Sequence, residues 1–279
     1  MTFAREPATK PGNPPHSHRA PAEFARRSLC GPFDVIGDVH GCLDELLELM
    51  ARLGYRVRRQ AGDFAVTPPG ERKLAFVGDL VDRGPATPGA LRLAMNMVRA
   101  GQAFCVPGNR DAELVRALQG RSVQITHGLA ISLEQLASEP EEFRVEAMRF
   151  LDGLPSHCVF DEGRLVIAHA GLKETLHGSS SAEACNFALR GETTSQKDAL
   201  PIRSNWVADY RGKALVVFGH TPVAEPLWMN NTVNVDTGCV YGGHLTALRY
   251  PERETVSVPA RAIYSQARRP FRVNDSLGA

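Results

Sequence analysis

Short apolar runs alternate with helix-like patterns in the first half of the chain. The segments 33–38, 73–79 and 103–109 are each apolar over most of their length, which is typical of buried strands. Between them, apolar residues recur at a helical spacing over 43–54 and 86–101, and each of these segments ends on a glycine. A shorter helix is expected after residue 109, ending at about Leu118. This alternation predicts βαβ units and a sheet that is buried on both faces.

The second half shows a different pattern, because its later strands have few helices between them. Strands are expected at 164–171, 214–220, 232–238, 245–250 and 255–260. Such spacing favours a sheet with mixed or antiparallel pairing. We therefore expect an α/β chain of mixed (α+β) character.

Prolines at the N-terminus interrupt any periodicity, so residues 1–30 are expected to form a disordered, proline-rich arm. The ordered domain is expected to span 31–265, and 266–279 is expected to be a loose tail. The length of 279 residues is sufficient for one large domain.

Composition narrows the function only a little. The net charge of +1 gives no general argument for a nucleic-acid or membrane surface. The six cysteines include no CxxC pair, and we interpret them as reduced thiols, most of them in the core. No apolar run is long enough for a bilayer and the N-terminus has no apolar signal core, so we expect a cytoplasmic protein without a membrane partner.

Polar side chains follow each strong strand directly. The five clusters are Asp38 and His40; Asp79, Asp82 and Arg83; Asn109, Arg110 and Asp111; His169; and His220. In open α/β sheets, sites form beyond the carboxyl ends of the strands. A single glycine–aspartate pair is often an ordinary turn, but five polar clusters in series after apolar strands indicate a functional site.

Six of these side chains together offer the donors of a two-metal site. They are three imidazoles, two carboxylates and one amide: His40, His169, His220, Asp38, Asp79 and Asn109. One octahedral ion cannot bind all of them as well as water and substrate, whereas two ions bridged by a carboxylate can. Nitrogen and oxygen donors without thiolate favour Mn²⁺, Fe or Zn²⁺ over Ca²⁺. The alternative, that the histidines are core residues, is weakened because His169 and His220 each end a strand.

The motif series D-x-H, G-D-x-x-D-R-G, G-N-x-D, H and G-H, from about Val35 to about Thr221, resembles the signature of calcineurin-like metallophosphoesterases. Segments 120–136, 187–194 and 234–260 are similar to the phosphatase domain of bacterial polynucleotide kinase-phosphatase, which extends the resemblance from about Phe33 to about Tyr264. Symmetrical dinucleoside tetraphosphatases and serine/threonine protein phosphatases share part of the pattern. The fold implied by the resemblance is a two-sheet β-sandwich flanked by helices.

The resemblance also implies a role for each motif residue. One ion would be held by Asp38, His40 and His220 and the other by Asn109 and His169, with Asp79 bridging the two. Arg83 would grip a phosphate oxygen with its planar guanidinium, and Asp236 matches a carboxylate near the site. The implied ions are two divalent transition metals, with Mn²⁺ preferred and Fe, Ni or Zn²⁺ as alternatives.

Arg110 departs from the family pattern, because the family has a histidine at this position and Asp82 normally orients that histidine. The family histidine is held to donate a proton to the leaving oxygen or to stabilise its charge. Arginine can stabilise an oxyanion but cannot release a proton near neutral pH. Three interpretations follow: reduced or narrowed activity with Arg110 paired to Asp82, near-normal activity with another proton donor, or a metal- or nucleotide-binding protein with little turnover.

The function implied is hydrolysis of phosphate esters by a hydroxide that bridges the two ions. The substrates expected from the resemblance are RNA 3′ ends or nucleotides, and separate kinase and ligase proteins would then be partners in RNA repair. The alternatives within the enzyme class are a serine/threonine protein phosphatase and a dinucleoside tetraphosphatase. An alternative outside the enzyme class is a metal- or nucleotide-binding protein with weak activity or none. Only the presence of Arg110 in place of the family histidine suggests it.

Overall fold

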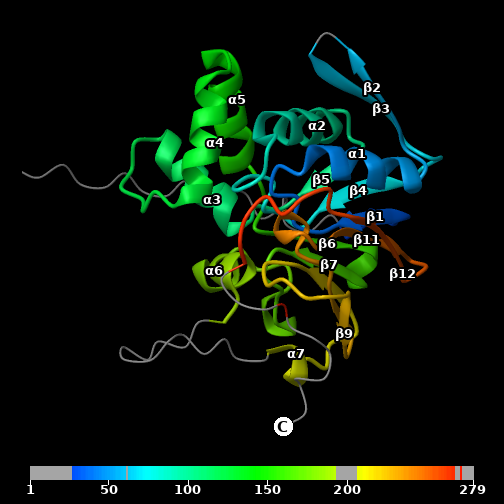
Figure 1. Ribbon diagram of the computed structural model, residues 1–279. Coiled ribbons are helices and arrows are strands. Elements are labelled where there is room, and N and C mark those ends of the chain that lie inside the picture. The colour runs from blue at the N-terminus through cyan, green and yellow to red at the C-terminus, as the bar shows by residue number, and fades with distance from the viewer. Residues whose placement is uncertain (1–26, 61, 193–205, 268–270, 272–279) are drawn as a thin grey trace, which may run out of the picture.

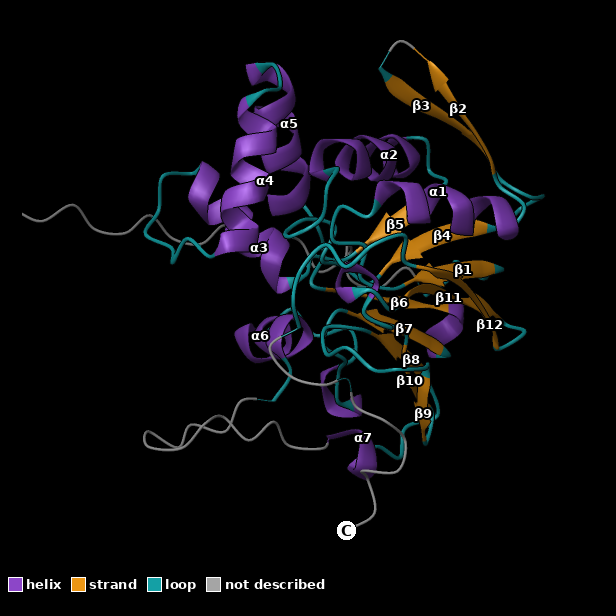
Figure 2. Ribbon diagram, viewed as in Figure 1, coloured by secondary structure: helices purple, strands orange, loops and turns teal. Residues whose placement is uncertain are grey.

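Two five-stranded sheets lie face to face in the computed structural model, with helices on the outside (Figures 1 and 2). The structure describes residues 27–60, 62–192, 206–267 and 271. The expected arm and tail fall almost entirely outside these residues, so the expected domain boundaries stay predictions. The mixed α/β architecture and the sandwich of two sheets confirm the fold expected from the sequence.

The first sheet has the strand order β12-β11-β1-β4-β5. Its parallel part is formed by β1 (Phe33–Ile36), β4 (Lys73–Phe76) and β5 (Ala103–Cys105). On the other side of β1, two antiparallel strands extend the sheet: β11 (His244–Tyr250) and β12 (Glu254–Pro259). The parallel part agrees with the βαβ units expected for the first half of the chain.

The second sheet has the order β6-β7-β8-β10-β9. Its three central strands are parallel: β7 (Leu165–Ala168), β8 (Leu215–Phe218) and β10 (Thr232–Asn234). The two edge strands are antiparallel to their neighbours: β6 (His157–Phe160) and β9 (Leu227–Met229). Mixed pairing in the second half is confirmed, but its last two strands, β11 and β12, belong to the first sheet.

Helices cover both outer faces of the sandwich. Those expected from the sequence are α1 (Leu43–Arg52), α2 (Thr87–Arg99) and α3 (Asn109–Leu118). The structure adds α4 (His127–Ala137), α5 (Glu141–Asp152), α6 (Ala182–Arg190), α7 (Trp206–Asp209) and the short 3₁₀ turns η2 (Asp161–Gly163), η3 (Glu174–Leu176) and η4 (Cys239–Tyr241). It also adds a separate hairpin, β2 (Arg56–Gln60) with β3 (Asp63–Thr67). Helices α1 and α2 lie over the first sheet, whereas α6 and α7 lie on the side of the second (Figure 1).

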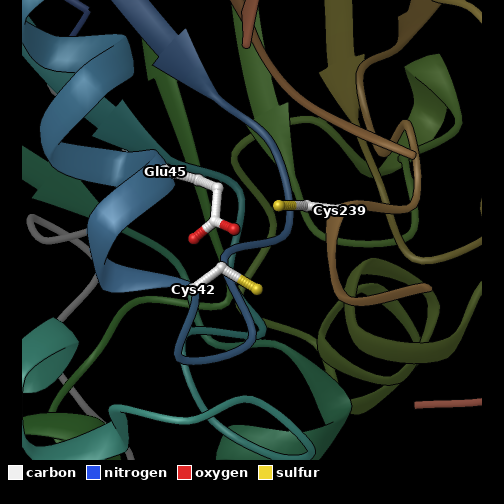
Figure 3. Close-up of side chains that lie close together, drawn as sticks. All are labelled: Cys42, Glu45 and Cys239. Carbon is white, nitrogen blue, oxygen red and sulfur yellow. The ribbon is translucent and has the colours of Figure 1, made fainter. Parts of the chain in front are cut away.

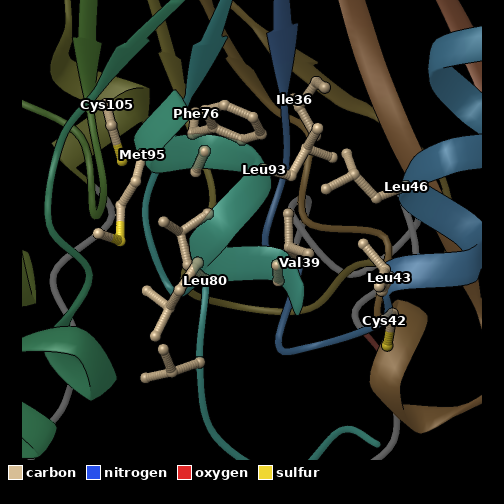
Figure 4. Packing of buried hydrophobic residues seen from close by; sticks show 14 of the residues in the cluster. Ile36, Val39, Cys42, Leu43, Leu46, Phe76, Leu80, Leu93, Met95 and Cys105 are labelled. Carbon is tan, nitrogen blue, oxygen red and sulfur yellow. The ribbon is translucent and has the colours of Figure 1, made fainter. Parts of the chain in front are cut away.

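Three buried apolar layers hold these elements together. Alternate residues of each strand face opposite layers, so Phe33 and Val35 of β1 lie between the sheets and Ile36 faces helices α1 and α2. Figure 4 shows part of the helix-facing layer, where Ile36 and Phe76 pack with residues from α1 and α2. A third layer lies between the second sheet and α6, where Trp206 packs against Phe187, Tyr210 and Phe218.

The strands end earlier than expected. The sequence predicted strands through Asp38, Asp79 and Asn109, but β1, β4 and β5 end at Ile36, Phe76 and Cys105. The physical reason is that the chain leaves the extended conformation to direct the polar side chains out of the sheet edge. Within the described residues, no helix is long and apolar enough to cross a membrane.

Candidate active site

The expected polar residues gather at the carboxyl ends of strands from both sheets. Asp38 and His40 follow β1, Asp79 follows β4, and Asn109 begins α3 just after β5. His169 directly follows β7 and His220 lies two residues after β8. All six side chains are buried or nearly so. The strand ends therefore bring together the residues that the sequence singled out, as expected for open parallel sheets.

Five non-glycine residues of the site have left-handed backbone conformations. Their φ values are 47° for His40, 47° for Asp79, 82° for Asp82, 74° for Arg83 and 73° for His220. Such conformations cost on the order of 1–3 kcal/mol each and persist only where the surrounding structure enforces them. Their concentration in the loops after β1, β4 and β8 marks this edge of the sheets as a functional site.

Two glycines allow the donor side chains to lie close to the backbone. A Cβ atom on Gly108 would lie 2.0 Å from Asp79 Oδ1, and one on Gly219 would lie 2.0 Å from Asp38 Oδ1. Both distances are far below van der Waals contact. These glycines are therefore needed for close approach to the neighbouring carboxylates, a reason that the sequence alone did not supply.

The donor atoms converge on a small volume. His169 Nε2 lies 3.0 Å from His220 Nδ1 and 3.2 Å from Asn109 Oδ1. Asp79 connects both sides of the site, with 3.6 Å from its Oδ1 to His169 Nε2 and 3.6 Å from its Oδ2 to His40 Nε2. Donor atoms of Asp38, Asp79 and His169 all lie within 4.8 Å of one another. Asp79 therefore occupies the central position that a bridging ligand requires.

The hydrogen bonds of two histidines fix which ring nitrogen faces the site. His40 Nδ1 lies 2.8 Å from the carbonyl oxygen of Val81, and His169 Nδ1 lies 3.1 Å from that of Val77. Because a carbonyl only accepts, each Nδ1 carries the proton and each Nε2 presents a lone pair. The Nε2 atom of His169 thus faces the amide and carboxylate oxygens named above, which are acceptors as well. Such convergence of acceptors suits a cation.

The electrostatics of the site also suit cations. Burial alone would raise the pKa of Asp79, but the imidazoles of His169, His40 and His220 lower it to about 2. Burial and the carboxylates of Asp236 and Asp79 raise the pKa of Asp38 well above its usual range. Burial raises the pKa of Asp236 to about 7. The hydrogen bond from the Gly238 N–H lowers this pKa, and the negative charge of Asp79 raises it. Buried carboxylates that repel one another would be stabilised by bound positive charge.

The donor set therefore fits a pair of divalent cations. Asp38, Asp79, Asn109, His169 and His220 lie within reach of such ions, and His40 Nε2 is contacted at 3.2 Å by Arg83 Nη1. That guanidinium would have to move aside for His40 to act as a ligand. When bound, two such ions would activate water and offset the negative charge that builds up on a phosphate.

Arg110 lies at the rim of the site and is held by two carboxylates. Its Nε is 3.3 Å from Asp82 Oδ2, and its Nη1 donates to Glu113 Oε2 at 2.7 Å. Its backbone N–H donates to Asp79 Oδ1 at 2.9 Å. The side chain of Arg110 is 25% exposed, so it is not closed off from a ligand. The expected pairing with Asp82 is therefore present.

Arg83 and Asp236 also lie where the sequence placed them. Arg83 Nη1 lies 3.5 Å from Asp82 Oδ2, and its guanidinium lies 5.5 Å from the centre of the Tyr241 ring. Asp236 is buried beyond β10, where its Oδ1 accepts from Gly238 N–H at 3.1 Å. The carbonyl oxygen of Val235, the residue before Asp236, packs against Gly37, the residue before Asp38, and the charge of Asp236 contributes to the raised pKa of Asp38.

The structure adds supporting residues that the sequence reasoning did not assign. Asp111 is fully buried and accepts from Gly108 N–H at 2.8 Å, which fixes the loop that carries Asn109. Ser132 Oγ accepts from Asp82 N–H at 3.0 Å. Asp111 is the last residue of the G-N-x-D motif, so the sequence offered a signal that it belongs to the site. Ser132 and Tyr241 carried no signal, because only the packing of distant segments places them here.

The motif spacing, the sandwich and the convergent donors all lead to one family. A family model described as calcineurin-like phosphoesterase matches residues 31–255. The chain belongs to this family. The expected family, the phosphatase class and the hydrolase activity are thereby confirmed, and phosphoesterases of this family use a pair of divalent metal ions.

Several relatives of this calcineurin-like phosphoesterase carry the name bis(5′-nucleosyl)-tetraphosphatase PrpE, asymmetrical. The one from Anoxybacillus flavithermus is 46% identical over 246 residues, covering 86% of this chain and 99% of the relative. The one from Halalkalibacterium halodurans is 46% identical over 235 residues, covering 82% of this chain and 94% of the relative. The dinucleoside tetraphosphatase branch, one of the stated alternatives, is thus represented among the relatives.

Solved structures share the fold. A structure assigned as a diadenosine tetraphosphatase superposes with a TM-score of 0.61 at 24% identity, covering 85% of this chain and 97% of the other. A serine/threonine phosphatase from Saccharomyces cerevisiae gives a TM-score of 0.55 at 12% identity, covering 88% of this chain and 85% of the other. At these identities the likeness concerns the fold alone.

Proposed function

We propose that this calcineurin-like phosphoesterase hydrolyses phosphoanhydride bonds of nucleoside polyphosphates, with dinucleoside tetraphosphates as the substrate class. The observation that carries the proposal is Arg110, an arginine held at the mouth of the site where the family has a histidine. The names of the relatives from Anoxybacillus flavithermus and Halalkalibacterium halodurans support the same substrate class.

Arg110 cannot serve as a proton donor in this setting. Burial alone would lower its pKa, but the carboxylates of Glu113, Asp79 and Asp82 raise it above the ordinary value of an arginine. The guanidinium therefore stays charged at every pH at which the enzyme would work. What it offers a substrate is a fixed positive charge and planar hydrogen-bond donors, both of which suit phosphate oxygens.

This difference matters because leaving groups differ in their need for a proton. An alkyl alcohol, such as the ribose hydroxyl of an RNA end, leaves poorly unless it is protonated. A phosphate leaving from an anhydride already carries its negative charge well, so a nearby arginine is sufficient. Loss of a general acid typically costs about 10²–10⁴-fold in rate, and this cost would fall on alkyl esters rather than on anhydrides.

In the proposed roles, Asp38, His40, Asp79, Asn109, His169 and His220 hold the two metal ions. Mn²⁺ is the ion preferred from the family resemblance, and Fe, Ni or Zn²⁺ are alternatives because nitrogen and oxygen donors without thiolate suit all of them. Arg83 and Arg110 bind phosphate oxygens, Asp82 positions Arg110, and Asp236 acts electrostatically on Asp38. RNA ends as substrate, kinase and ligase partners, and a cytoplasmic location stay predictions.

The test compares three substrates with Mn²⁺: diadenosine tetraphosphate, p-nitrophenyl phosphate and an RNA oligonucleotide with a 3′-phosphate. We expect the wild type to have its highest kcat/KM on diadenosine tetraphosphate. We expect Arg110→His to increase hydrolysis of the RNA 3′-phosphate by at least about 10-fold and to change the tetraphosphate rate little. Chromatography of the products shows whether cleavage gives ATP with AMP or two ADP molecules.

The matched control is Arg116→His, which changes an arginine on the same helix, α3, whose Nη2 donates to the carbonyl oxygen of Ser122 instead. This variant should behave like the wild type on all three substrates. A wild type that prefers the RNA 3′-phosphate would contradict the proposal and favour the RNA-end function. A wild type that contains two metal ions but hydrolyses none of the three would favour a binding protein.

A further inference from the structure

A second group of potential metal donors lies close to the active site but shares no residue with it. Cys42, Glu45 and Cys239 approach one another from the start of α1 and from the η4 turn (Figure 3). One donor atom from each, two sulfurs and a carboxylate oxygen, lie within 4.8 Å of one another. Relative exposure is 0% for Cys42, 0% for Glu45 and 1% for Cys239, so the whole group is buried.

The Glu45 carboxylate is held in a fixed orientation. Its Oε1 accepts from the backbone N–H of Arg261 at 2.9 Å and from the hydroxyl of Tyr264 at 2.7 Å. Its other oxygen, Oε2, is buried and makes no hydrogen bond with any part of the chain that the structure describes. Two donors on one oxygen therefore hold in place a carboxylate whose second oxygen has no partner among the described residues, and this carboxylate lies beside the two thiols.

No cationic side chain compensates this oxygen among the contacts of the described residues. The guanidinium of Arg261, whose backbone N–H donates to the other oxygen of Glu45, pairs instead with Asp44 at 2.9 Å and Glu48 at 3.7 Å. A buried acceptor without a partner is unfavourable, typically by about 1–3 kcal/mol. A cation between the carboxylate and the two sulfurs would remove that cost.

We propose that Cys42, Cys239 and Glu45 supply three of the four ligands of a site for a thiophilic divalent cation of the Zn²⁺ type, with the fourth position open to a water molecule. Two thiolates and one carboxylate are donors that Zn²⁺ binds, and the cation would replace the two thiol protons. The Tyr264 hydroxyl and Arg261 N–H act as the outer hydrogen-bond partners that orient a ligating carboxylate. The sulfur donors distinguish this site from the active site, whose donors are nitrogen and oxygen only.

Such a cation would join three segments of the chain. Cys42 lies two residues after His40, and Cys239 lies three residues after Asp236. The third segment is 261–265, where the N–H groups of Tyr264 and Ser265 both donate to the carbonyl oxygen of Val240. The site would therefore stabilise two loops that carry active-site residues and fasten the segment after β12 over them.

The test uses cobalt, because thiolate-bound Co²⁺ has a charge-transfer absorption in the near ultraviolet that nitrogen and oxygen ligands do not produce. The full chain is produced in cells supplied with cobalt and analysed for metal content and absorption. We expect a thiolate–cobalt band in the wild type and complete loss of it in Cys42→Ala/Cys239→Ala. The matched control is Cys105→Ala/Cys158→Ala, which removes two other buried cysteines and should keep the band.

A second variant covers the case in which the double alanine variant fails to fold. Glu45→Gln keeps the size of the side chain, so the variant should keep the fold. It removes one of the proposed ligands, so the thiolate–cobalt band should be weaker than in the wild type. The proposal is overturned if the folded wild type shows no thiolate–cobalt band. It is also overturned if the band survives without Cys42 and Cys239, or if mass spectrometry finds these two cysteines joined in a disulfide. Hydrolysis of p-nitrophenyl phosphate serves only to confirm folding.

Discussion

The two sheets contribute to one site with different chemistry. Loops after the first sheet supply the carboxylates Asp38 and Asp79, the amide of Asn109, the imidazole of His40 and both guanidinium groups, whereas loops after the second sheet supply the imidazoles of His169 and His220 and the buried carboxylate of Asp236. The loops of the first sheet also hold four of the five left-handed residues of the site.

This difference indicates a division of labour. Every group proposed to touch the phosphate, namely Arg83 and Arg110, comes from the first sheet, together with Asp82, which positions Arg110. The second sheet completes the donor set through His169 and His220. The first sheet should therefore control chemistry and substrate choice, and the second should control chiefly how tightly metal is held. Four measurements can break or sharpen this comparison.

The largest effect is expected for Asp79→Asn, which removes the central charge of the first-sheet donors while keeping the side-chain size. Activity on diadenosine tetraphosphate should fall by at least about 10³-fold, because the two ions supply several kcal/mol of charge stabilisation. Added Mn²⁺ should not restore it. Circular dichroism checks that the fold is kept, and recovery at high Mn²⁺ would argue against a bridging role for Asp79.

The next largest effect is expected for the pH dependence of the free energy of unfolding, through His157 of the second sheet. Burial and His177 lower the pKa of His157, on edge strand β6, to about 4. The unfolded chain binds a proton at His157 more readily than the folded chain does. The buried neutral imidazole of His157 therefore contributes fully to the free energy of unfolding above about pH 6.5, and this contribution is lost as pH falls toward about 4. The expected loss is about 3 kcal/mol.

Urea unfolding of the wild type and His157→Gln at several pH values measures this contribution. The glutamine amide oxygen can still accept from the Gly178 N–H, which donates to His157 Nε2 at 2.9 Å. The wild type should lose more stability than the variant between neutral pH and pH 4. Parallel curves for the two proteins would show that His157 does not set the pH sensitivity of this sheet.

A smaller effect is expected for His220→Asn, which changes a second-sheet donor. Activity should fall by about 10–100-fold at low Mn²⁺ and recover largely at high Mn²⁺, since the loss is in metal affinity. A titration of activity against Mn²⁺ measures the shift, with His244→Asn as the control, because His244 lies exposed at the start of β11. A loss that no Mn²⁺ concentration corrects would break the proposed division of labour.

The smallest effect is expected for Gly219→Ala, which tests how the sheets meet. The added methyl group would lie 2.0 Å from Asp38 Oδ1 and force a residue of the second sheet against one of the first. Overpacking of this kind costs about 1–3 kcal/mol. Gly120→Ala is the comparison, because nothing lies within 4 Å of its Cβ position and only its φ of +69° opposes the change. Urea unfolding measures the stability of both variants. If Gly219→Ala and Gly120→Ala lose the same free energy of unfolding, close packing at Gly219 is refuted.

Much of the site was predictable because it depends on local chain chemistry. Apolar runs that end in polar residues identified the ends of β1, β4, β5, β7 and β8, and the six donors follow directly from them. The helices α4 and α5 and the hairpin β2–β3 were not predicted, and strand ends were placed two to four residues too late. Local patterns define strands better than the points at which tertiary contacts bend the chain away from them.

The sequence by itself determined the family, the parallel part of the first sheet, and the kinds of donor that gather at the strand ends. Apolar periodicity and motif spacing act over short distances, so one chain is sufficient to read them. The tertiary structure alone decided that β11 and β12 join the first sheet, that Val235, next to Asp236, packs against Gly37, next to Asp38, and that Cys42 meets Cys239. These contacts join segments far apart in the chain, and they exist only because buried layers on both faces of each sheet fix where the strands lie.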